Sequence, residues 1–219
     1  MKTMLAPSVG EGMPIDVGGV RLTGDLIIPE NAKGLVLFAH GSGSSRKSSR
    51  NRFVAEILHE EGVGTLLFDL LTLDEEAEDA YTAHLRFDID MLSERLIDVT
   101  KWMFERYGDF EAGYFGASTG AAAALNGAAE LGKKIRSVVS RGGRPDLAGP
   151  NLEQVSAPTL LIVGSRDHPV IELNEQAFEQ LRCEKKLVQV PGATHLFEEP
   201  GTLQEAARLA AGWFKVHFG

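Results

Sequence analysis

The chain has 219 residues, 43% of them hydrophobic, which is enough for one domain with a substantial core. Its 31 acidic and 22 basic residues give a formal charge of −9, which argues against a nucleic-acid partner because phosphate binding needs a positive surface. A single cysteine excludes an internal disulfide and a multi-cysteine zinc site, and without an apolar run long enough for a membrane span or a signal peptide we expect a cytoplasmic protein.

A predicted β-hairpin opens the chain, because apolar and polar residues alternate over residues 13–28 around Gly18-Gly19. Short apolar runs rich in β-branched or aromatic residues follow, and they predict strands at 35–39, 65–68, 113–115, 135–139, 159–163 and 187–190. Apolar residues three and four apart predict helices between these strands, at about 53–61, 85–103, 118–131, 173–181 and 203–214. Thr202 and Glu205 have capping-box spacing at the start of the last helix.

This alternation of strands and helices is typical of a mostly parallel sheet with helices on both faces. The leading hairpin adds antiparallel strands at one edge. No linker rich in proline, serine or charge divides the chain, so we expect residues 1–219 to form one α/β domain. Ligands of such sheets bind beyond the carboxyl ends of the strands, and the loops that follow the strands are therefore where functional groups are expected.

The segment from Gly116 to Gly120 reads Gly-Ala-Ser-Thr-Gly and matches the pattern G-x-S-x-G. It follows a predicted strand and leads into an alanine-rich predicted helix, which is the strand–turn–helix setting of a nucleophile elbow. The glycines permit a sharp turn that presents the Ser118 hydroxyl, and the helix start places backbone N–H groups beside it. Ser118 is therefore the candidate nucleophile. The alternative is a glycine-rich turn with an idle serine.

An acid and a histidine follow Ser118 in the chain order expected for this architecture. Asp167 comes just after the predicted strand 159–163 and can orient a histidine; the other interpretations are a helix-capping role for Asp167 or a catalytic role for Asp146. His195 follows the predicted strand 187–190 and is the candidate base, with His168 as its competitor. His168 stands next to Asp167 on a short loop, which makes a productive acid–histidine geometry difficult.

A loop of small residues, His40-Gly-Ser-Gly-Ser, follows the predicted strand 35–39. Acyl transfer needs two N–H donors for the oxyanion, and we expect them from Thr119, directly after the nucleophile, and from Ser42, with Gly43 as the less favoured option. A phosphate cradle is excluded because the loop lacks the Gly-Lys pair of a P-loop and the third glycine of a dinucleotide fingerprint. His40 is expected to brace this loop.

The segments FAHGSGSSR, GYFGASTGAAAAL, APTLLIVG and VPGATHLFEEPG give the chain a resemblance to the α/β-hydrolase superfamily, in its dienelactone-hydrolase-like branch of small bacterial serine hydrolases. The resemblance runs from about residue 20 to the end. It implies an α/β-hydrolase fold, a Ser118–His195–Asp167 triad and an oxyanion hole at Thr119 and Ser42. Relatives in this group can be fused to a phosphoribosyltransferase domain, which we do not expect here. Dienelactone hydrolases proper carry a cysteine where this chain has Ser118, so the family name is not taken as its activity.

The expected activity is hydrolysis of a small, short-acyl carboxylic ester through an acyl-enzyme, without metal or organic cofactor. The same triad also serves acyltransferases and small peptidases, and a non-enzymatic ligand-binding module is the other alternative. We expect a small-molecule ester as the partner and no nucleic acid or membrane; a homo-oligomer is compatible with the sequence.

The segment between the predicted strands 135–139 and 159–163 is too short for a lid domain, so the site is expected to be open. Arg141 and Arg144 begin this segment, and Arg46 and Arg50 lie near the oxyanion loop. These arginines are candidates for binding an anionic substrate. The alternative, which we favour from sequence, is that they pair with the many carboxylates.

Overall fold

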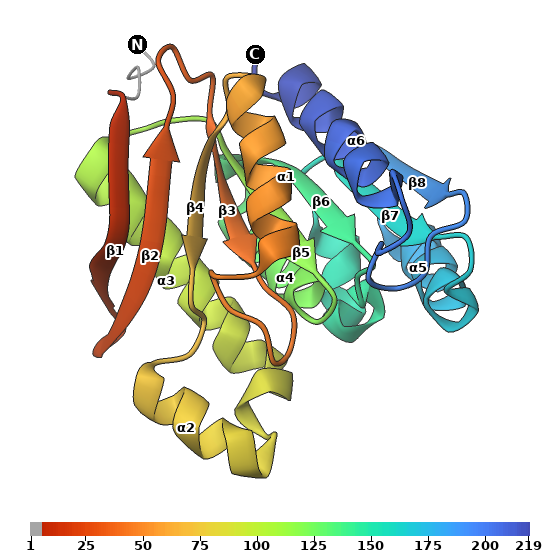
Figure 1. Cartoon of the computed structure of the whole chain (residues 1–219), viewed down its shortest axis with the longest axis horizontal. Helices are drawn as coiled ribbons and strands as arrows, with labels where there is room; N and C mark the ends of the chain where they lie inside the picture. Colours follow the sequence, from red (N-terminus) through yellow and green to blue (C-terminus); the bar gives the residue numbers. More distant parts are fainter. Residues whose placement is uncertain (1–5) are drawn as a thin grey trace.

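Eight strands form one sheet in the computed structural model, which describes residues 6–219 (Figure 1). In spatial order they are β1 (Ser8–Val17), β2 (Val20–Ile28), β4 (Gly64–Phe68), β3 (Leu35–Ala39), β5 (Ala112–Ala117), β6 (Ile135–Arg141), β7 (Thr159–Gly164) and β8 (Lys185–Val190). The strands from β4 to β8 in this order run parallel, while β1 and β2 form an antiparallel hairpin that pairs antiparallel with β4. The carboxyl ends of the parallel strands therefore meet at one edge.

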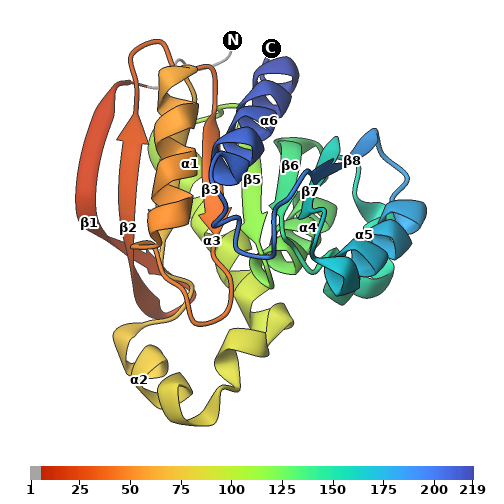
Figure 2. The ribbon, with the colours of Figure 1, turned by 45° about the vertical axis from the view of Figure 1, so that its right-hand side comes forward.

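Helices cover both faces of the sheet, as the two views in Figures 1 and 2 show. One face carries α1 (Ser49–Glu60) and α6 (Thr202–His217), and the other carries α3 (Ile89–Tyr107), α4 (Gly120–Leu131) and α5 (His168–Gln180). Short 3-10 segments are η1 (Leu85–Phe87), η2 (Gly132–Lys134) and η3 (Pro145–Gln154). The remaining helix, α2 (Leu73–Thr82), follows β4 and projects past the carboxyl end of the sheet (Figure 1).

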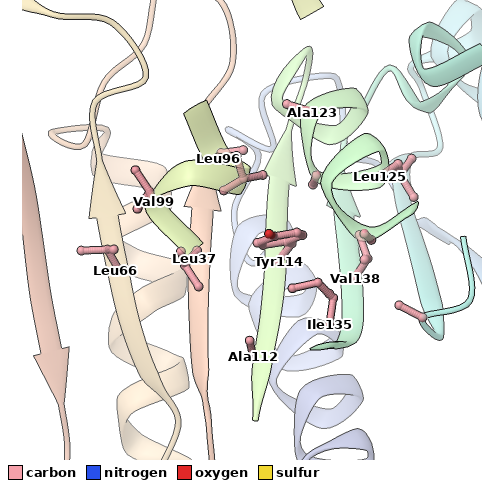
Figure 3. Packing of buried hydrophobic residues seen from close by; sticks show 14 of the residues in the cluster. Leu37, Leu66, Leu96, Val99, Ala112, Tyr114, Ala123, Leu125, Ile135 and Val138 are labelled. Atoms are coloured by element: carbon pink, nitrogen blue, oxygen red, sulfur yellow. The ribbon is translucent and has the colours of Figure 1, made fainter. Parts of the chain in front are cut away.

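Each face of the sheet has its own apolar core. On the face of α3 and α4, Leu96 and Val99 pack over Leu37 and Tyr114 of the sheet (Figure 3). Tyr114 is fully buried, and its hydroxyl is satisfied by Thr100 Oγ1 at 2.7 Å. Five alanines of α4, Ala121 to Ala124 and Ala128, are also fully buried, and their small side chains let the helix lie close to β5. That close approach fixes the turn between β5 and α4.

The predicted fold class is confirmed: the sheet is mostly parallel, it carries helices on both faces and it has an antiparallel hairpin at one edge. Each apolar run assigned to a strand lies in a strand, although most strands extend one or two residues further. Between β6 and β7 there is only η3, in agreement with the expected absence of a lid domain.

Three local features of the helices differ from the sequence-based expectations. The predicted helix 85–103 is divided, because η1 ends at Phe87 and Asp88 is the N-cap residue of α3. The predicted capping box of α6 is wrong, because Gly201 is the N-cap residue and the Thr202 hydroxyl donates to Glu199 O instead. A capping box does occur at α2, a helix that the apolar periodicity did not reveal. There the Thr72 hydroxyl accepts from Glu75 N, and the Glu75 carboxylate accepts from Thr72 N.

Candidate active site

Ser118 lies at the sharp turn between β5 and α4, with a left-handed backbone φ of 51°. A Cβ at Gly120 would stand 2.1 Å from Ala39 O, and one at Gly116 would stand 2.4 Å from the Cα of Ala121. Both contacts are with backbone, so only glycine fits at these positions. The G-x-S-x-G pattern is thus required sterically, and it leaves Ser118 partly exposed at the carboxyl edge of the sheet.

His195 and Asp167 meet at the same edge, from the loops after β8 and β7. His195 Nδ1 is 2.7 Å from Asp167 Oδ2, which fits a donated N–H when Nε2 is the unprotonated nitrogen. The carboxylate side chain is 12% exposed and the imidazole 39% exposed. Asp167 occupies the N-cap position of α5, but its side chain makes no capping hydrogen bond. Its carboxylate binds His195 Nδ1 instead.

The two competing residues lie outside this arrangement. Asp146 binds Arg144 through two hydrogen bonds of 2.9 and 2.8 Å. His168 is exposed at the first residue of α5. Neither residue lines the cavity that contains Ser118.

That cavity has a volume of about 250 Å³ and is lined by both Ser118 and His195. Within residues 6–219, the Ser118 hydroxyl has no hydrogen bond to His195 or to another side chain. The distance between a catalytic serine and its histidine is often longer without substrate. What links Ser118 to His195 in this structure is that both line the same cavity. It brings a hydroxyl and an oriented imidazole to one space that a small substrate can occupy.

The loop that contains His195 is held tightly against the ends of β6 and β7. A Cβ at Gly142, which has a φ of 51°, would be 3.0 Å from His195 O. A Cβ at Gly164 would be 2.4 Å from Ala193 O and 2.6 Å from Thr194 O. The histidine loop therefore rests directly on the backbone of the two strand ends.

The two expected oxyanion donors, Ser42 and Thr119, contact each other. The Ser42 N–H donates to Thr119 Oγ1 at 2.9 Å, so this amide is engaged in the structure. The Thr119 N–H has no hydrogen-bond partner within the described part of the chain. Of the two amides, the one at the start of α4 is free.

His40 and Asp69 hold the loop that carries Ser42. The His40 Nε2 accepts from Leu70 N–H at 3.0 Å, so Nδ1 carries the proton that is shared with Gly41 O, also at 3.0 Å. Burial lowers the pKa of His40 and favours this neutral form. Asp69 accepts from the backbone N–H of Arg46 at 2.8 Å and pairs with the Arg46 guanidinium. His40 thus braces the loop, as expected.

The four arginines that the sequence proposed as substrate ligands have different environments. Arg50 lines the cavity of Ser118 and lies 3.6 Å from Glu198. Arg46 pairs with Asp25 and Asp69. Arg144 pairs with Asp146, so both of these cations are compensated within the protein. Arg141, the last residue of β6, lines the cavity of Ser118 and forms no ion pair within residues 6–219.

Sequence reasoning did not find two features of this edge. Asn51 of α1 also lines the cavity, although no motif marks it. A second cavity, of about 200 Å³, lies on the other side of the Gly41–Ser45 loop, between Thr119 and the α2–η1 segment. Its wall includes Arg86, which pairs with the buried Asp79, and the Thr72–Glu75 capping box is the sequence signal that could have indicated this segment.

The described residues contain no group of three or more His, Cys, Asp or Glu side chains placed to hold a metal ion. In residues 6–219, no helix combines the length and the apolar character needed to cross a lipid bilayer.

Comparison with solved structures places the chain among hydrolases. A dienelactone hydrolase from Anabaena variabilis is 54% identical, with a TM-score of 0.93 over 96% of this chain and 98% of that chain. Est1E from Butyrivibrio proteoclasticus has the same fold at 18% identity, with a TM-score of 0.79 over 95% of this chain and 99% of that chain. No protein-family model matches the chain.

Among curated proteins, two Mycobacterium tuberculosis sequences, from strains H37Rv and CDC 1551, are each 54% identical over 213 residues. Both carry provisional names as phosphoribosyl transferases. The match covers 96% of this chain but 47% of each relative. The chain therefore spans about half the length of these curated relatives.

Proposed function

The chain belongs to the dienelactone-hydrolase-like branch of the α/β-hydrolases, and from this premise we propose that it is a serine hydrolase that cleaves a small carboxylic ester. The observation that carries the proposal is the 2.7 Å hydrogen bond between His195 and Asp167, beside the strained Ser118 in one cavity. A strained backbone at a partly exposed serine and a carboxylate that orients a histidine are both typical of an activated nucleophile.

In the proposed mechanism, His195 Nε2 takes the Ser118 proton as the hydroxyl oxygen attacks the ester carbonyl. Asp167 keeps the proton on Nδ1 and stabilises the imidazolium that forms. His195 then gives the proton to the departing alkoxide. Water attacks the acyl-enzyme by the same route, with His195 as base, and releases the acid and Ser118.

The free Thr119 amide is the first proposed oxyanion donor. The Ser42 amide is the second, and it becomes available when the Thr119 hydroxyl rotates away about χ1 and the substrate oxygen takes its place. A donor of this kind contributes about 100–1,000-fold in rate.

The names of the relatives do not decide the substrate. Dienelactone is what the Anabaena protein is named for, and the phosphoribosyl transferase name belongs to proteins about twice as long as this chain. Added alcohol acceptors would separate acyl transfer from ester hydrolysis by the products formed.

Labelling with a fluorophosphonate tests the nucleophile without a known substrate. We expect stoichiometric labelling at Ser118, none in Ser118→Ala, and a rate reduced by several orders of magnitude in His195→Ala, because the base is lost. The matched control is His168→Ala, which removes the neighbouring exposed histidine and should label at the wild-type rate. A folded wild-type protein that is not labelled at Ser118 would refute the proposed mechanism.

A further inference from the structure

The second cavity at this edge lies beside both candidate oxyanion donors. It has a volume of about 200 Å³, and its wall includes Ser42 and Thr119, while Ser42 also lines the cavity of Ser118. The 2.9 Å hydrogen bond from Ser42 N–H to Thr119 Oγ1 therefore lies at the boundary between the two cavities. An ester whose carbonyl oxygen is held by these two amides has its carbonyl carbon at this boundary.

The two cavities extend to opposite sides of Ser118. In the sheet, β4 and β3 lie on one side of β5, which leads to Ser118, and β6, β7 and β8 lie on the other. The second cavity is lined by Leu70 and Leu71, which follow β4, and by the α2–η1 segment (Figure 1). The cavity of Ser118 is lined by Gly142, which follows β6, and by His195, which follows β8. A substrate bound at Ser118 therefore has the histidine on one side and the second cavity on the other.

This arrangement assigns the two halves of an ester to different cavities. In the proposed mechanism, His195 gives a proton to the departing alkoxide, so the alcohol oxygen lies within hydrogen-bond reach of its Nε2. The alcohol half therefore occupies the cavity that His195 lines. The acyl chain leaves the carbonyl carbon in a different direction, because that carbon becomes tetrahedral when Ser118 attacks. The second cavity borders the oxyanion amides on the side away from His195, and it can receive this chain.

Apolar side chains form much of the wall of the second cavity. Leu70 and Leu92 are buried, Leu71 is half-buried, and Ala80 is an exposed residue of α2. An apolar cavity of about 150 Å³ holds benzene, so the volume of about 200 Å³ accommodates an acyl chain of about four to six carbons.

The charges around the second cavity disfavour an anionic acyl group. Arg86 is the one lysine or arginine that residues 6–219 contribute to its wall, and it is paired with Asp79. Asp69 is paired with Arg46, whereas Glu76 has no ion pair within the described part of the chain. The balance of charge is therefore negative, and a carboxylate on the acyl chain would be repelled without gaining a free cation.

We propose that the second cavity is the acyl subsite of the enzyme, and that it takes an uncharged aliphatic acyl chain of about four to six carbons. The alcohol half of the ester then lies in the cavity beside His195. This inference rests on the proposed function and names the acyl class of its substrate.

Ala80→Trp tests this assignment, because a large side chain at this exposed position of α2 fills the second cavity. We expect the kcat/KM of the wild type to rise about tenfold from 4-nitrophenyl acetate to 4-nitrophenyl butyrate, because each buried CH₂ group contributes about fourfold. Ala80→Trp should lose this rise and hydrolyse the acetate within about threefold of wild type. The matched control is Ala77→Trp, which lies on the same helix but outside the cavity wall and should keep the rise. Both variants should melt at the wild-type Tm, because both positions are exposed.

Two further comparisons identify the half of the ester that the second cavity binds and the charge that it accepts. Along the acetates of ethanol, 1-butanol and 1-hexanol, Ala80→Trp should show the same length dependence as wild type, because the alcohol half lies in the other cavity. The wild type should hydrolyse 4-nitrophenyl adipate, whose acyl chain ends in a free carboxylate, about tenfold more slowly than 4-nitrophenyl hexanoate. A loss of the alcohol-length dependence in Ala80→Trp, or a preference for the adipate, overturns the assignment.

Binding to the inactive enzyme separates this inference from the proposed function. In Ser118→Ala, millimolar hexanamide should raise the Tm, and in the Ser118→Ala/Ala80→Trp double variant it should not. Wild-type protein that labels at Ser118 but shows no rise with acyl length, or a rise that survives in Ala80→Trp, overturns the acyl subsite and leaves the hydrolase proposal intact. Wild-type protein that does not label, but whose Ser118→Ala variant still responds to hexanamide through Ala80, refutes the proposed mechanism and keeps the second cavity as a binding site for the chain.

Discussion

Ser118 holds a left-handed backbone conformation that L-residues adopt only at a cost of about 1–2 kcal/mol. The surrounding structure imposes it, since β5 and α4 are fixed by the apolar core and the turn between them has no other path. Such strain is typical of functional positions and is compensated elsewhere in the fold. The strain at Ser118 therefore predicts that the residue needed for activity at this position lowers the stability of the fold.

Ser118→Gly should therefore be more stable than Ser118→Ala by about 1 kcal/mol, because both variants lose the hydroxyl but only glycine adopts a positive φ without strain. Urea unfolding of the two variants measures the difference. If alanine were the more stable of the two, the backbone at position 118 would not be strained in solution.

Gly120→Ala should destabilise the protein by about 1–3 kcal/mol or more, because its Cβ would lie 2.1 Å from Ala39 O and the backbone must move. The same shift should slow labelling of Ser118. Gly212→Ala is the matched control: Gly212 lies in α6, and a Cβ there meets nothing within 4 Å. This control should be neutral or stabilising by up to about 1 kcal/mol. Equal effects of both substitutions would rule out the steric explanation.

The candidate triad could be predicted from sequence because its residues follow strands in a fixed chain order, and strand ends of a parallel sheet meet at one edge. The ion pairing of the arginines could not be predicted from sequence. Arg46, Arg141 and Arg144 have similar sequence contexts, but only the fold decides which carboxylates they reach. The same holds for the Ser42 amide, whose partner Thr119 is 77 residues away.

At the scale of elements, the strands were predictable because buried parallel strands are short, continuous apolar runs. Helix α2 was not, since it projects from the sheet and buries little apolar surface; Leu73 and Tyr81 are among its exposed residues. Polar contacts hold it instead. Its capping box begins the helix, and Arg95 of α3 pairs with Glu75.

Thr72→Ala should destabilise α2 locally by about 1 kcal/mol, because the N-terminal amides of the helix lose their acceptor. Hydrogen exchange should then accelerate in residues 73–82 and remain unchanged in the central strands, since local openings need not involve the core. Acceleration throughout the chain would show instead that α2 unfolds only together with the sheet.

At the scale of the whole molecule, the ion pair between Glu75 and Arg95 makes the free energy of unfolding depend on pH. Hydrogen bonds from Arg95, against an opposing effect of burial, lower the pKa of Glu75 to about 2. A carboxyl with a lowered folded pKa contributes stability that is fully present above its unfolded pKa, about 4.5, and that is lost as the pH falls towards 2.

Glu75→Gln should therefore cost about 2 kcal/mol in the free energy of unfolding at pH 7, and the difference from wild type should shrink between pH 4.5 and 2. Urea unfolding across this range measures both quantities. The control, Glu179→Gln, replaces an exposed carboxylate without an ion pair in the described residues and should follow the wild-type pH profile. A constant difference between Glu75→Gln and wild type at all pH values would exclude the ion pair as its cause.

The contact of the histidine loop with Gly142 and Gly164 has a consequence for how this enzyme can acquire new specificity. A side chain at Gly164 displaces the backbone that leads to His195, and one at Gly142 is strained by its φ of 51° and crowds the same backbone. We therefore expect substitutions at these two glycines to disturb the position of His195. Leu196, which is 41% exposed, and Ser44 line the cavity that contains Ser118, and neither position is a glycine packed against the histidine loop. A mutant library that fixes the two glycines and randomises these neighbours keeps the catalytic geometry constant while the shape of the pocket evolves.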